Sequence, residues 1–376
     1  MKSKNVLSLR FALPLLVAGV ASTLLLTGMV NPVYAGKPPP PPPPPPVDSG
    51  AIYFNNNNGS GLQLWSMKPD GTSQTALPVL NAGAAEPSRV LHGGKRWFVT
   101  MQTIPNEFYP TDPNGNDYPR QELFAVSDQG ESFQLTDNPA IEAYEPRWTS
   151  GVGGVDGRIT LVGLRWVQDA DGKSVSIEPG VYYIDVTPET WTSAPPAPQS
   201  PQRLDTISLP VAQDAVGYYA DVSGYDWSPD GTHVVYAASD GLYIAQASDG
   251  ATGQLLTVSG ATSPRWSPVQ ANGRTQILFG VGGGHNGRID RVNDDGSGWI
   301  AVIPALPHKD KNEARISPNS ARWSPAGSHF VYRVEQYKFS LLPESTAIDR
   351  AAADGSGKTV LISVVRWCVP LGWVSP

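Results

Sequence analysis

Two histidines in long segments of this sequence are of a type that does acid–base or metal chemistry. His285 and His308 lie between predicted strands, and Asp310 and Glu313 follow the second histidine closely. Imidazole and carboxylate groups bind divalent metals, but catalytic zinc usually has three protein ligands in a defined geometry. Because only two histidines are available on this side of the predicted fold, we expect no metal site. Metal-dependent chemistry at these histidines is the enzyme alternative.

Arginine directly precedes tryptophan four times, which is a second pattern with chemical consequences. The four arginines are Arg147, Arg265, Arg322 and Arg366. Neighbouring side chains on a strand point to opposite faces, so each arginine points away from its tryptophan. Two interpretations stay open. Either the arginines pair with carboxylates or stack on aromatic rings between structural units, or they form a cationic ring that binds an anionic ligand.

The segment 104–120 combines aromatic, acidic and proline residues. Its binding candidates are Phe108, Tyr109, Asp112, Asp117 and Tyr118. Rigid aromatic side chains beside polar groups are typical of surfaces that bind protein or sugar. The alternative is a surface loop that packs on the rest of the fold without a ligand.

Two acidic turns suggest calcium, and one glycine-rich turn resembles a nucleotide site. Residues 112–117 and 169–172 lack the glycine and the bidentate glutamate that an EF-hand loop needs, and turn chemistry explains them. We therefore expect no cofactor, with calcium as the alternative. Residues 355–359 end like a P-loop, but Ala352 stands where that motif needs glycine, and a strand follows instead of a helix. This excludes the nucleotide site.

Composition and charge narrow the classes of function. The chain has 376 residues, a formal net charge of −7, 11 Trp and 14 Tyr. A net acidic chain lacks the basic footprint of a nucleic-acid-binding protein, and its aromatic content argues against disorder. The single cysteine, Cys368, excludes a disulfide framework and a four-cysteine zinc site.

The first 50 residues have the pattern of an export signal followed by a spacer. Basic residues precede an uncharged apolar run at 11–30, and Val33 and Ala35 suit the −3 and −1 positions of a signal-peptidase site. We expect residues 1–35 to be cleaved as a signal peptide, which places the protein in the periplasm or outside the cell. An uncleaved signal anchor is the alternative, because the run is long enough to span a bilayer. Residues 36–50 form a proline-rich linker, which is stiff.

From residue 51 onward two β-hairpin patterns alternate, and no segment has a sustained helical period. One hairpin has an Asp-Gly turn and occurs at 289–303 and 348–362. The other begins with a strand that ends in Trp-Ser-Pro and occurs at 225–236, 264–279 and 321–332. Two hairpins make a four-stranded unit, and such units must stack to bury their faces, which predicts a β-propeller.

The segment Trp227-Ser-Pro-Asp-Gly231 resembles the WD40-like repeat of TolB-type propellers, and looser copies extend the resemblance over about residues 51–376. The resemblance implies a periplasmic protein that binds partner proteins, as TolB does in the Tol–Pal envelope system. The sequence departs from TolB, which carries an α/β domain before its propeller where this chain has the proline tract. The same repeat occurs in propellers of prolyl-oligopeptidase-like enzymes, but the chain has no Gly-x-Ser-x-Gly elbow.

Six inner strands are predicted, near residues 88, 147, 226, 265, 322 and 366. The last has no partner after it, and strands at 51–54, 62–68 and 74–77 supply the rest of its blade. We therefore expect residues 51–376 to form an all-β, six-bladed propeller of four-stranded antiparallel blades, closed by pairing of the N- and C-terminal segments. Closure also hides the sheet edges. A seventh blade would need strands within 190–222.

Chain direction alternates along a blade, so the short Pro/Gly turns share one face and the long connections share the other. Long loops on a rigid scaffold usually carry the binding residues, which favours the long-loop face. We expect an exported, monomeric, non-enzymatic propeller that binds an envelope or extracellular protein and contacts membrane only if the signal is uncleaved. The alternative is a lyase or hydrolase of saccharides, or a protein that binds sugars or anions. Some propeller lyases that act on pectic fragments use histidine and a divalent metal.

Overall fold

In a computed structural model of the chain, the described residues form β-strands almost throughout. They are residues 49–57, 61–80, 85–109, 117–150, 156–168, 170, 174–191, 193–204, 211–213, 218–220, 223–247, 253–258, 260–268, 274–282, 287–305, 315–337, 343–364 and 367–376. The predicted signal peptide and most of the linker lie outside them. Within these ranges the one helix is a short 3₁₀ turn, Pro188–Thr190, and no helix is long and apolar enough to cross a bilayer.

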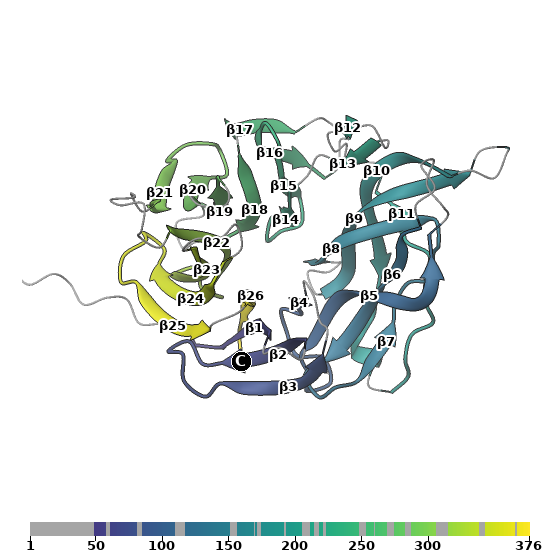
Figure 1. Cartoon of the computed structure of the whole chain (residues 1–376), viewed down its shortest axis with the longest axis horizontal. Helices are drawn as coiled ribbons and strands as arrows, with labels where there is room; N and C mark the ends of the chain where they lie inside the picture. The colour runs from purple at the N-terminus through teal and green to yellow at the C-terminus, as the bar shows by residue number, and fades with distance from the viewer. Residues whose placement is uncertain are drawn as a thin grey trace, which may run out of the picture. The chain divides into compact units, whose positions relative to one another are not determined.

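Six four-stranded antiparallel sheets form the blades of a propeller, and their inner strands surround its centre (Figure 1). Blade 1 contains β26 (Trp367–Val374), β1 (Ala51–Asn57), β2 (Leu62–Met67) and β3 (Thr75–Leu80). Blade 2 contains β4 (Glu86–Pro87), β5 (Trp97–Phe108), β6 (Pro119–Ser127) and β7 (Ser132–Gln134). Blade 3 contains β8 (Ile141–Ser150), β9 (Asp156–Gln168), β10 (Ser174–Asp185) and β11 (Gln202–Arg203).

The other three blades carry the Trp-Ser-Pro motif. Blade 4 contains β14 (Tyr225–Trp227), β15 (His233–Ala238), β16 (Gly241–Gln246) and β17 (Gln254–Val258). Blade 5 contains β18 (Ala261–Trp266), β19 (Gln276–Val281), β20 (Arg288–Asn293) and β21 (Ile300–Ile303). Blade 6 contains β22 (Arg315–Trp323), β23 (His329–Tyr337), β24 (Ser345–Ala352) and β25 (Thr359–Val364).

Blade 1 joins the two ends of the propeller. Its inner strand β26 pairs with β1 over the whole of β1, from Ala51 opposite Val374 to Asn57 opposite Trp367. The predicted closure and the predicted number of blades are therefore confirmed. In the described part of 190–222, the chain adds only β11 and a two-stranded ribbon of β12 (Val211–Gln213) and β13 (Tyr218–Ala220), so no seventh blade is formed there.

The Trp-Ser-Pro motif ends an inner strand with a reproducible set of hydrogen bonds. The Oγ of Ser228 accepts the backbone N–H of His233 at 2.9 Å, and the Oγ of Ser324 accepts that of His329 at 3.0 Å. Gly231 follows in the turn with a φ of 70°, a conformation that glycine adopts without strain. The serine therefore joins the end of the first strand to the start of the second, which explains why this motif recurs in the sequence.

Inner-strand tryptophans connect neighbouring blades. The Nε1 of Trp148 in blade 3 donates to the backbone oxygen of Glu86 in blade 2 at 3.1 Å. The Nε1 of Trp323 in blade 6 donates in the same way to Arg265 in blade 5, also at 3.1 Å. Because each bond crosses a blade boundary, these two tryptophans contribute to blade stacking.

Two histidines, which follow the turn of the Trp-Ser-Pro motif in blades 4 and 6, pack on the tryptophan of the next blade. The His233 and Trp266 ring centroids are 6.5 Å apart, and those of His329 and Trp373 are 6.4 Å apart. The repeat pattern places Trp367 at this point of the last inner strand, and that register is wrong. Trp373 is the buried residue, whereas Trp367 is 39% exposed near the other end of β26.

Candidate functional site

Three of the four arginines that precede a tryptophan lie together around the central channel. Arg147 is on β8, Arg265 on β18 and Arg322 on β22, and all three line one cavity. Arg147 and Arg265 are each only 5% exposed. Arg366 lies outside the described residues, so the structure places three of the four arginines. These three residues define the arginine cluster.

A β-bulge precedes each member of the arginine cluster. The ladders shift register at 144/147, 262/265 and 319/322. Each shift contains a non-glycine residue with positive φ: Glu145 at 52°, Ser263 at 48° and Ser320 at 52°. Such residues are uncommon, and a bulge re-aims the side chains beside it. The same local distortion in three blades therefore presents an arginine to the channel each time.

Two cavities meet at the arginine cluster. The first, of about 330 Å³, is lined by the Trp-Ser-Pro residues of blades 4, 5 and 6 and by Trp373. The second, of about 360 Å³, is lined by the bulge residues together with Arg147 and Arg333. Glu86, Arg265, Arg322 and Leu371 line both cavities.

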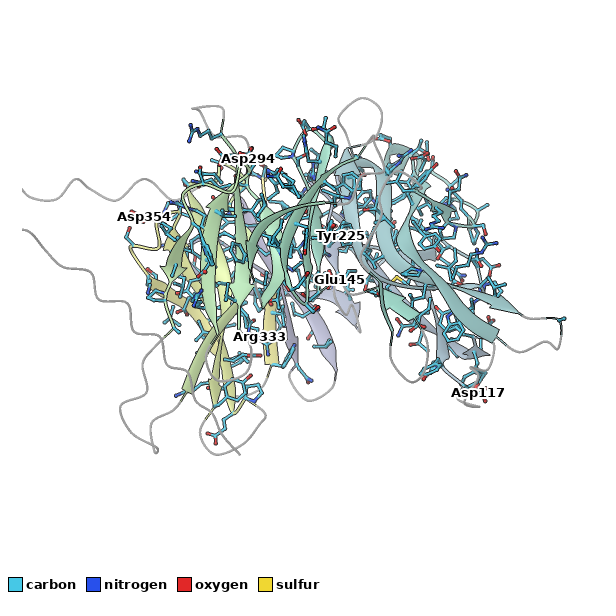
Figure 2. The ribbon with its side chains drawn as sticks, turned by 90° about the horizontal axis from the view of Figure 1, so that it is seen from above. Asp117, Glu145, Tyr225, Asp294, Arg333 and Asp354 are labelled. Carbon is cyan, nitrogen blue, oxygen red and sulfur yellow. The ribbon has the colours of Figure 1, made fainter. Side chains whose placement is uncertain are left out.

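The two cavities approach the cluster from opposite faces of the propeller. In Figure 2, Glu145 and Arg333, which line the second cavity, lie toward the face opposite the Asp-Gly turns at Asp294 and Asp354. Turn residues such as Pro229, Pro268 and Pro325 line the first cavity, so it lies toward the short-turn face. The expectation that binding residues belong to the long-loop face therefore does not cover the arginines, which border space on both faces.

Arg147 has a full set of partners. Its Nη2 lies 3.0 Å from Glu145 and its Nη1 3.6 Å from Glu86. Its Nε donates to the backbone oxygen of Tyr225 at 3.3 Å. Burial lowers the pKa of Arg147, but the charges of Glu86 and Glu145 outweigh burial and raise it. The structural interpretation of the arginines, pairing between blades, describes Arg147.

Arg265 and Arg322 lack such carboxylate contacts. No described residue accepts a hydrogen bond from Nε or Nη1 of Arg265, although both atoms are buried. Arg322 donates Nε to the backbone oxygen of Leu371 and Nη1 to its neighbour Ala321, each at 2.9 Å. Burial, and next the charge of Arg147, lower the pKa of Arg265. Burial, and next the charge of Arg265, lower that of Arg322 well below its ordinary value. The second interpretation, a site for an anion, fits these two.

Two acids of the channel were missed by sequence reasoning. Asp226 directly precedes Trp227 and so takes the place in blade 4 that arginine takes in blades 3, 5 and 6. An alignment of the repeats would have found it. Burial raises its pKa despite the opposing charge of Arg265, and it accepts the backbone N–H of Trp266 at 2.8 Å. Glu86 comes from the degenerate repeat of blade 2, where no tryptophan marks the inner strand.

The segment 104–120 extends β5 and β6 into a long hairpin. Phe108, at the end of β5, is 55% exposed, and Tyr118, before β6, is 37% exposed beside Trp166. Asp117 is also exposed and lies at the lower right of Figure 2, on the side away from the Asp-Gly turn at Asp294. These three candidates, Phe108, Asp117 and Tyr118, define the hairpin surface. Asp112 lies outside the described residues.

Tyr109 does not contribute to the hairpin surface, because it is only 3% exposed. Its hydroxyl donates to the backbone oxygen of Gln121 at 2.8 Å and accepts the N–H of the same residue at 3.1 Å. Burial raises its pKa to about 12. Tyr109 therefore fastens one arm of the hairpin to the other.

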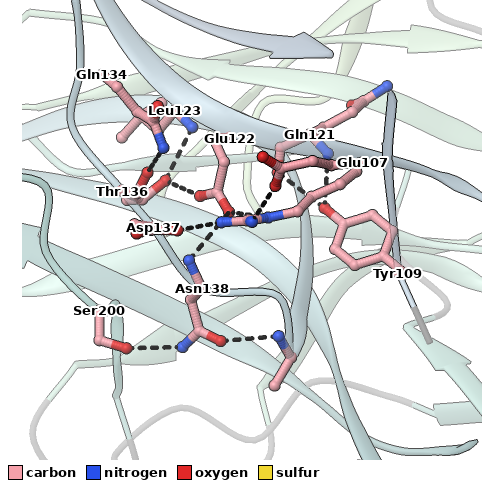
Figure 3. A network of polar contacts seen from close by, with 12 residues as sticks. Glu107, Tyr109, Gln121, Glu122, Leu123, Gln134, Thr136, Asp137, Asn138 and Ser200 are labelled. Carbon is pink, nitrogen blue, oxygen red and sulfur yellow. Dashed lines mark hydrogen bonds and ion pairs between the residues drawn. The ribbon is translucent and has the colours of Figure 1, made fainter. Parts of the chain in front are cut away.

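At the base of the hairpin, Arg120 is surrounded by carboxylates (Figure 3). Its guanidinium contacts Glu107 and Asp137, and lies 2.7 Å from Glu122. Burial lowers the pKa of Arg120, but the hydrogen bonds to Asp137 and Glu122 outweigh burial and raise it. Glu122 also accepts the backbone N–H of Asn138 at 3.0 Å. These residues form a saturated polar network that supports the hairpin.

The histidine candidates for a metal, His285 and His308, lie outside the described residues, and the structure therefore does not place them. Among the residues that are described, no group of three or more His, Cys, Asp or Glu side chains has the arrangement of a metal site.

Comparison with known proteins shows which solved structures share this fold. No protein-family model and no curated protein match the sequence. The structure is similar to TolB of Acinetobacter baumannii, with a TM-score of 0.52 and 15% identity over 87% of this chain and 67% of that one. It also matches a protein assigned as TolB from Agrobacterium tumefaciens, with a TM-score of 0.42 and 15% identity over 85% and 90% of the two chains.

An oligogalacturonate lyase in complex with manganese matches with a TM-score of 0.40 and 13% identity over 74% of this chain and 72% of that one. At such identities, and above all at the lower TM-scores, the similarity carries the architecture and nothing of the activity. The described part of this chain is a TolB-like six-bladed β-propeller.

Proposed function

We propose that this chain is an exported β-propeller that binds a protein partner in the cell envelope or outside the cell. The observation that carries the proposal is the 55% exposure of Phe108 at the end of a long, well-supported hairpin. Exposed aromatic side chains on rigid elements are typical anchors of protein–protein interfaces, because little conformational entropy is lost when they bind.

The hairpin surface is preorganised by the residues below it. Tyr109 links the two arms, and the carboxylates around Arg120 support their base. The Tyr118 ring lies 6.3 Å from that of Trp166 on the neighbouring blade, which restricts its orientation. A partner that docks on the hairpin surface therefore meets side chains that are already positioned.

Export is supported by the N-terminal sequence. The apolar run at 11–30, and Val33 and Ala35 after it, have the pattern of a cleaved secretion signal. Fractionation of the producing cells and N-terminal sequencing test this part. The proposal expects the protein in the periplasm or the medium, with Gly36 as its first residue. Full-length protein in the cytoplasm would contradict it.

Site-specific photo-crosslinking in the producing cells tests the interaction. A photoreactive amino acid at position 108 is expected to capture one discrete protein. The matched control is position 360 on the outer strand β25, because Val360 is apolar and 62% exposed but lies in blade 6. The same captured proteins from both positions, or none from position 108, would contradict docking on the hairpin surface.

A further inference from the structure

We propose that the central channel binds an organic monocarboxylate. Arg265 and Arg322 are the hydrogen-bond donors, and the tryptophans and prolines that line the first cavity form the apolar wall. This site is separate from the hairpin surface, so the proposal goes beyond protein docking and does not depend on it.

The unused donors of Arg265 are the first argument. The side chain is 5% exposed, and its buried Nε and Nη1 have no acceptor among the described residues. A buried donor without a partner destabilises the folded protein, and more so when it is charged. Arg265 lines both channel cavities, so its guanidinium borders space that a ligand can enter from either face.

Arg322 supplies the second donor. Its Nε and Nη1 are used by the backbone oxygens of Leu371 and Ala321, and no described residue accepts from its Nη2. These two bonds hold the guanidinium in place while one edge stays available to the channel. After burial, the charge of Arg265 is the main cause that lowers the pKa of Arg322, so the two guanidinium groups repel each other. An anion between them offsets this repulsion.

The charge balance favours a single negative charge on the ligand. Glu145 and Glu86 contact Arg147, at 3.0 Å and 3.6 Å, and so compensate that residue first. Asp226 lies nearby in the channel, where its carboxylate accepts two backbone N–H groups. Because Glu86, Glu145 and Asp226 all lie close to the arginine cluster, they repel a singly charged carboxylate less than a phosphate dianion.

The walls of the first cavity indicate what the carboxylate is attached to. Trp227, Trp266, Trp323 and Trp373 line it together with three turn prolines and Leu371. Its volume of about 330 Å³ lies at the lower end of small-molecule sites. An aromatic or short aliphatic group fits such a wall while its carboxylate reaches the arginines at the narrow part of the channel.

The strained bulges support a binding role for the cluster. Positive φ at Glu145, Ser263 and Ser320 places non-glycine residues in an unfavourable backbone conformation. Blade 4 has Gly224, with a φ of 115°, at the corresponding position before Asp226. The same conformation therefore recurs at one position of the inner strand, two residues before a side chain that lines the channel.

Calorimetric titration of the purified protein with benzoate and benzamide tests the charge requirement. The two ligands have the same ring and nearly the same shape, but only benzoate is an anion. We expect benzoate to bind at least about tenfold more tightly, because the charged hydrogen bonds to guanidinium are lost with the amide. Equal binding of both, no binding of benzoate, or binding of inorganic phosphate in preference to benzoate would each overturn the proposal.

Variants locate the site. Arg265→Met is expected to lower benzoate affinity at least about tenfold, and Arg322→Gln to lower it less, because Arg322 offers one donor. The matched control is Arg158→Met, which removes an arginine that pairs with Asp185 outside the channel, and it should bind as the unaltered protein does. If Arg265→Met does not fold, Arg265→Lys takes its place and is expected to weaken binding as well. Unchanged affinity in the Arg265 variants would overturn the assignment.

Titration with a peptide distinguishes between two sources of the carboxylate, a polypeptide C-terminus and a small organic acid. N-acetyl-diphenylalanine carries a free C-terminal carboxylate, and its amide does not. Tighter binding of the free peptide than of benzoate, lost on amidation, assigns the site to a polypeptide C-terminus. Tighter binding of benzoate assigns it to small organic acids.

Discussion

Two arginines in similarly buried positions have opposite surroundings. Arg120, below the hairpin, contacts Glu107, Glu122 and Asp137, and the hydrogen bonds to Asp137 and Glu122 raise its pKa against the effect of burial. Arg265, in the channel, has no hydrogen-bond acceptor for its buried Nε and Nη1 among the described residues, and burial lowers its pKa. Each nitrogen of the Arg120 guanidinium has a carboxylate partner, whereas two nitrogens of the Arg265 guanidinium have no hydrogen-bond acceptor among the described residues.

The difference separates a structural arginine from one that is available to a ligand. A charge that is taken out of water needs partners from the protein, and Arg120 has them. Where the fold holds a guanidinium in place without them, the missing acceptors must come from solvent or a ligand. The comparison therefore predicts that replacing Arg120 destabilises the protein, whereas replacing Arg265 leaves its stability unchanged or increases it.

The largest effect is expected for Arg120→Met. The change leaves Glu122, which is 3% exposed, without its guanidinium, and breaking one side of a buried ion pair costs about 3 kcal/mol or somewhat more. Urea unfolding followed by tryptophan fluorescence measures the loss. In the double variant Arg120→Met with Glu122→Gln, much of the stability should return, because the orphaned charge is gone. Equal stability of the single variant and the unaltered protein would remove the distinction between the two arginines.

A buried carboxyl extends the comparison to the opposite charge. Asp349 on β24 has a buried Oδ1 without a hydrogen-bond partner in the described part of the chain. Burial raises its pKa from 3.8 to about 6. Between about pH 4 and pH 6 the folded protein therefore binds the proton more tightly than the unfolded chain does. Because of this group, the free energy of unfolding falls as pH rises through this range, and the destabilisation is complete above about pH 6.

Asp349→Asn should therefore stabilise the protein at pH 7–8, and the gain should disappear near pH 4. Melting temperatures of both proteins over this pH range measure the difference in stability. The contributions of groups that titrate alike in the two proteins cancel in this difference. A gain that is independent of pH would show that the carboxyl is not penalised by burial.

A smaller effect on stability is expected for Arg265→Met. Replacing a buried charge that lacks partners with an apolar side chain of similar size is often neutral or stabilising, so the free energy of unfolding should stay within about 1 kcal/mol or increase. The same urea titration measures it beside Arg120→Met. A loss as large as that of Arg120→Met would show that Arg265 is held by contacts of structural importance, and the comparison would fail.

The fold was predictable from sequence because its signals are local. The Trp-Ser-Pro turn depends on a serine and a glycine close to each other in the chain, and the same pattern recurs in blades 4, 5 and 6. Closure by the two chain ends followed from counting strands. The register of β26 did not, because Val374 separates its buried tryptophan, Trp373, from Ser375-Pro376, whereas in blades 4, 5 and 6 Ser-Pro follows the tryptophan directly.

The channel site was predictable only in part. Arg265 and Arg322 were visible as arginines before tryptophan, but nothing local to them tells which arginine has a partner. That depends on Glu86, which is brought in from blade 2, and on bulges formed by ordinary residues such as Ser263. Sequence reasoning did not separate exposed Phe108 from buried Tyr109, because it treated segment 104–120 as a loop and not as paired strands, in which neighbouring side chains point to opposite sides.

The smallest effects on stability are expected for replacements of Tyr109 and Phe108. Tyr109→Phe removes a buried hydroxyl that makes two hydrogen bonds with Gln121, so it should lower the free energy of unfolding by about 1 kcal/mol. Phe108→Ser changes an exposed side chain and should change the free energy of unfolding by no more than about 0.5 kcal/mol, while it abolishes capture of a partner by a photoreactive amino acid at position 118 of the hairpin surface. Destabilisation by Phe108→Ser as large as that by Tyr109→Phe would show that its ring packs on the protein itself. The hairpin surface would then lose its main anchor for a partner.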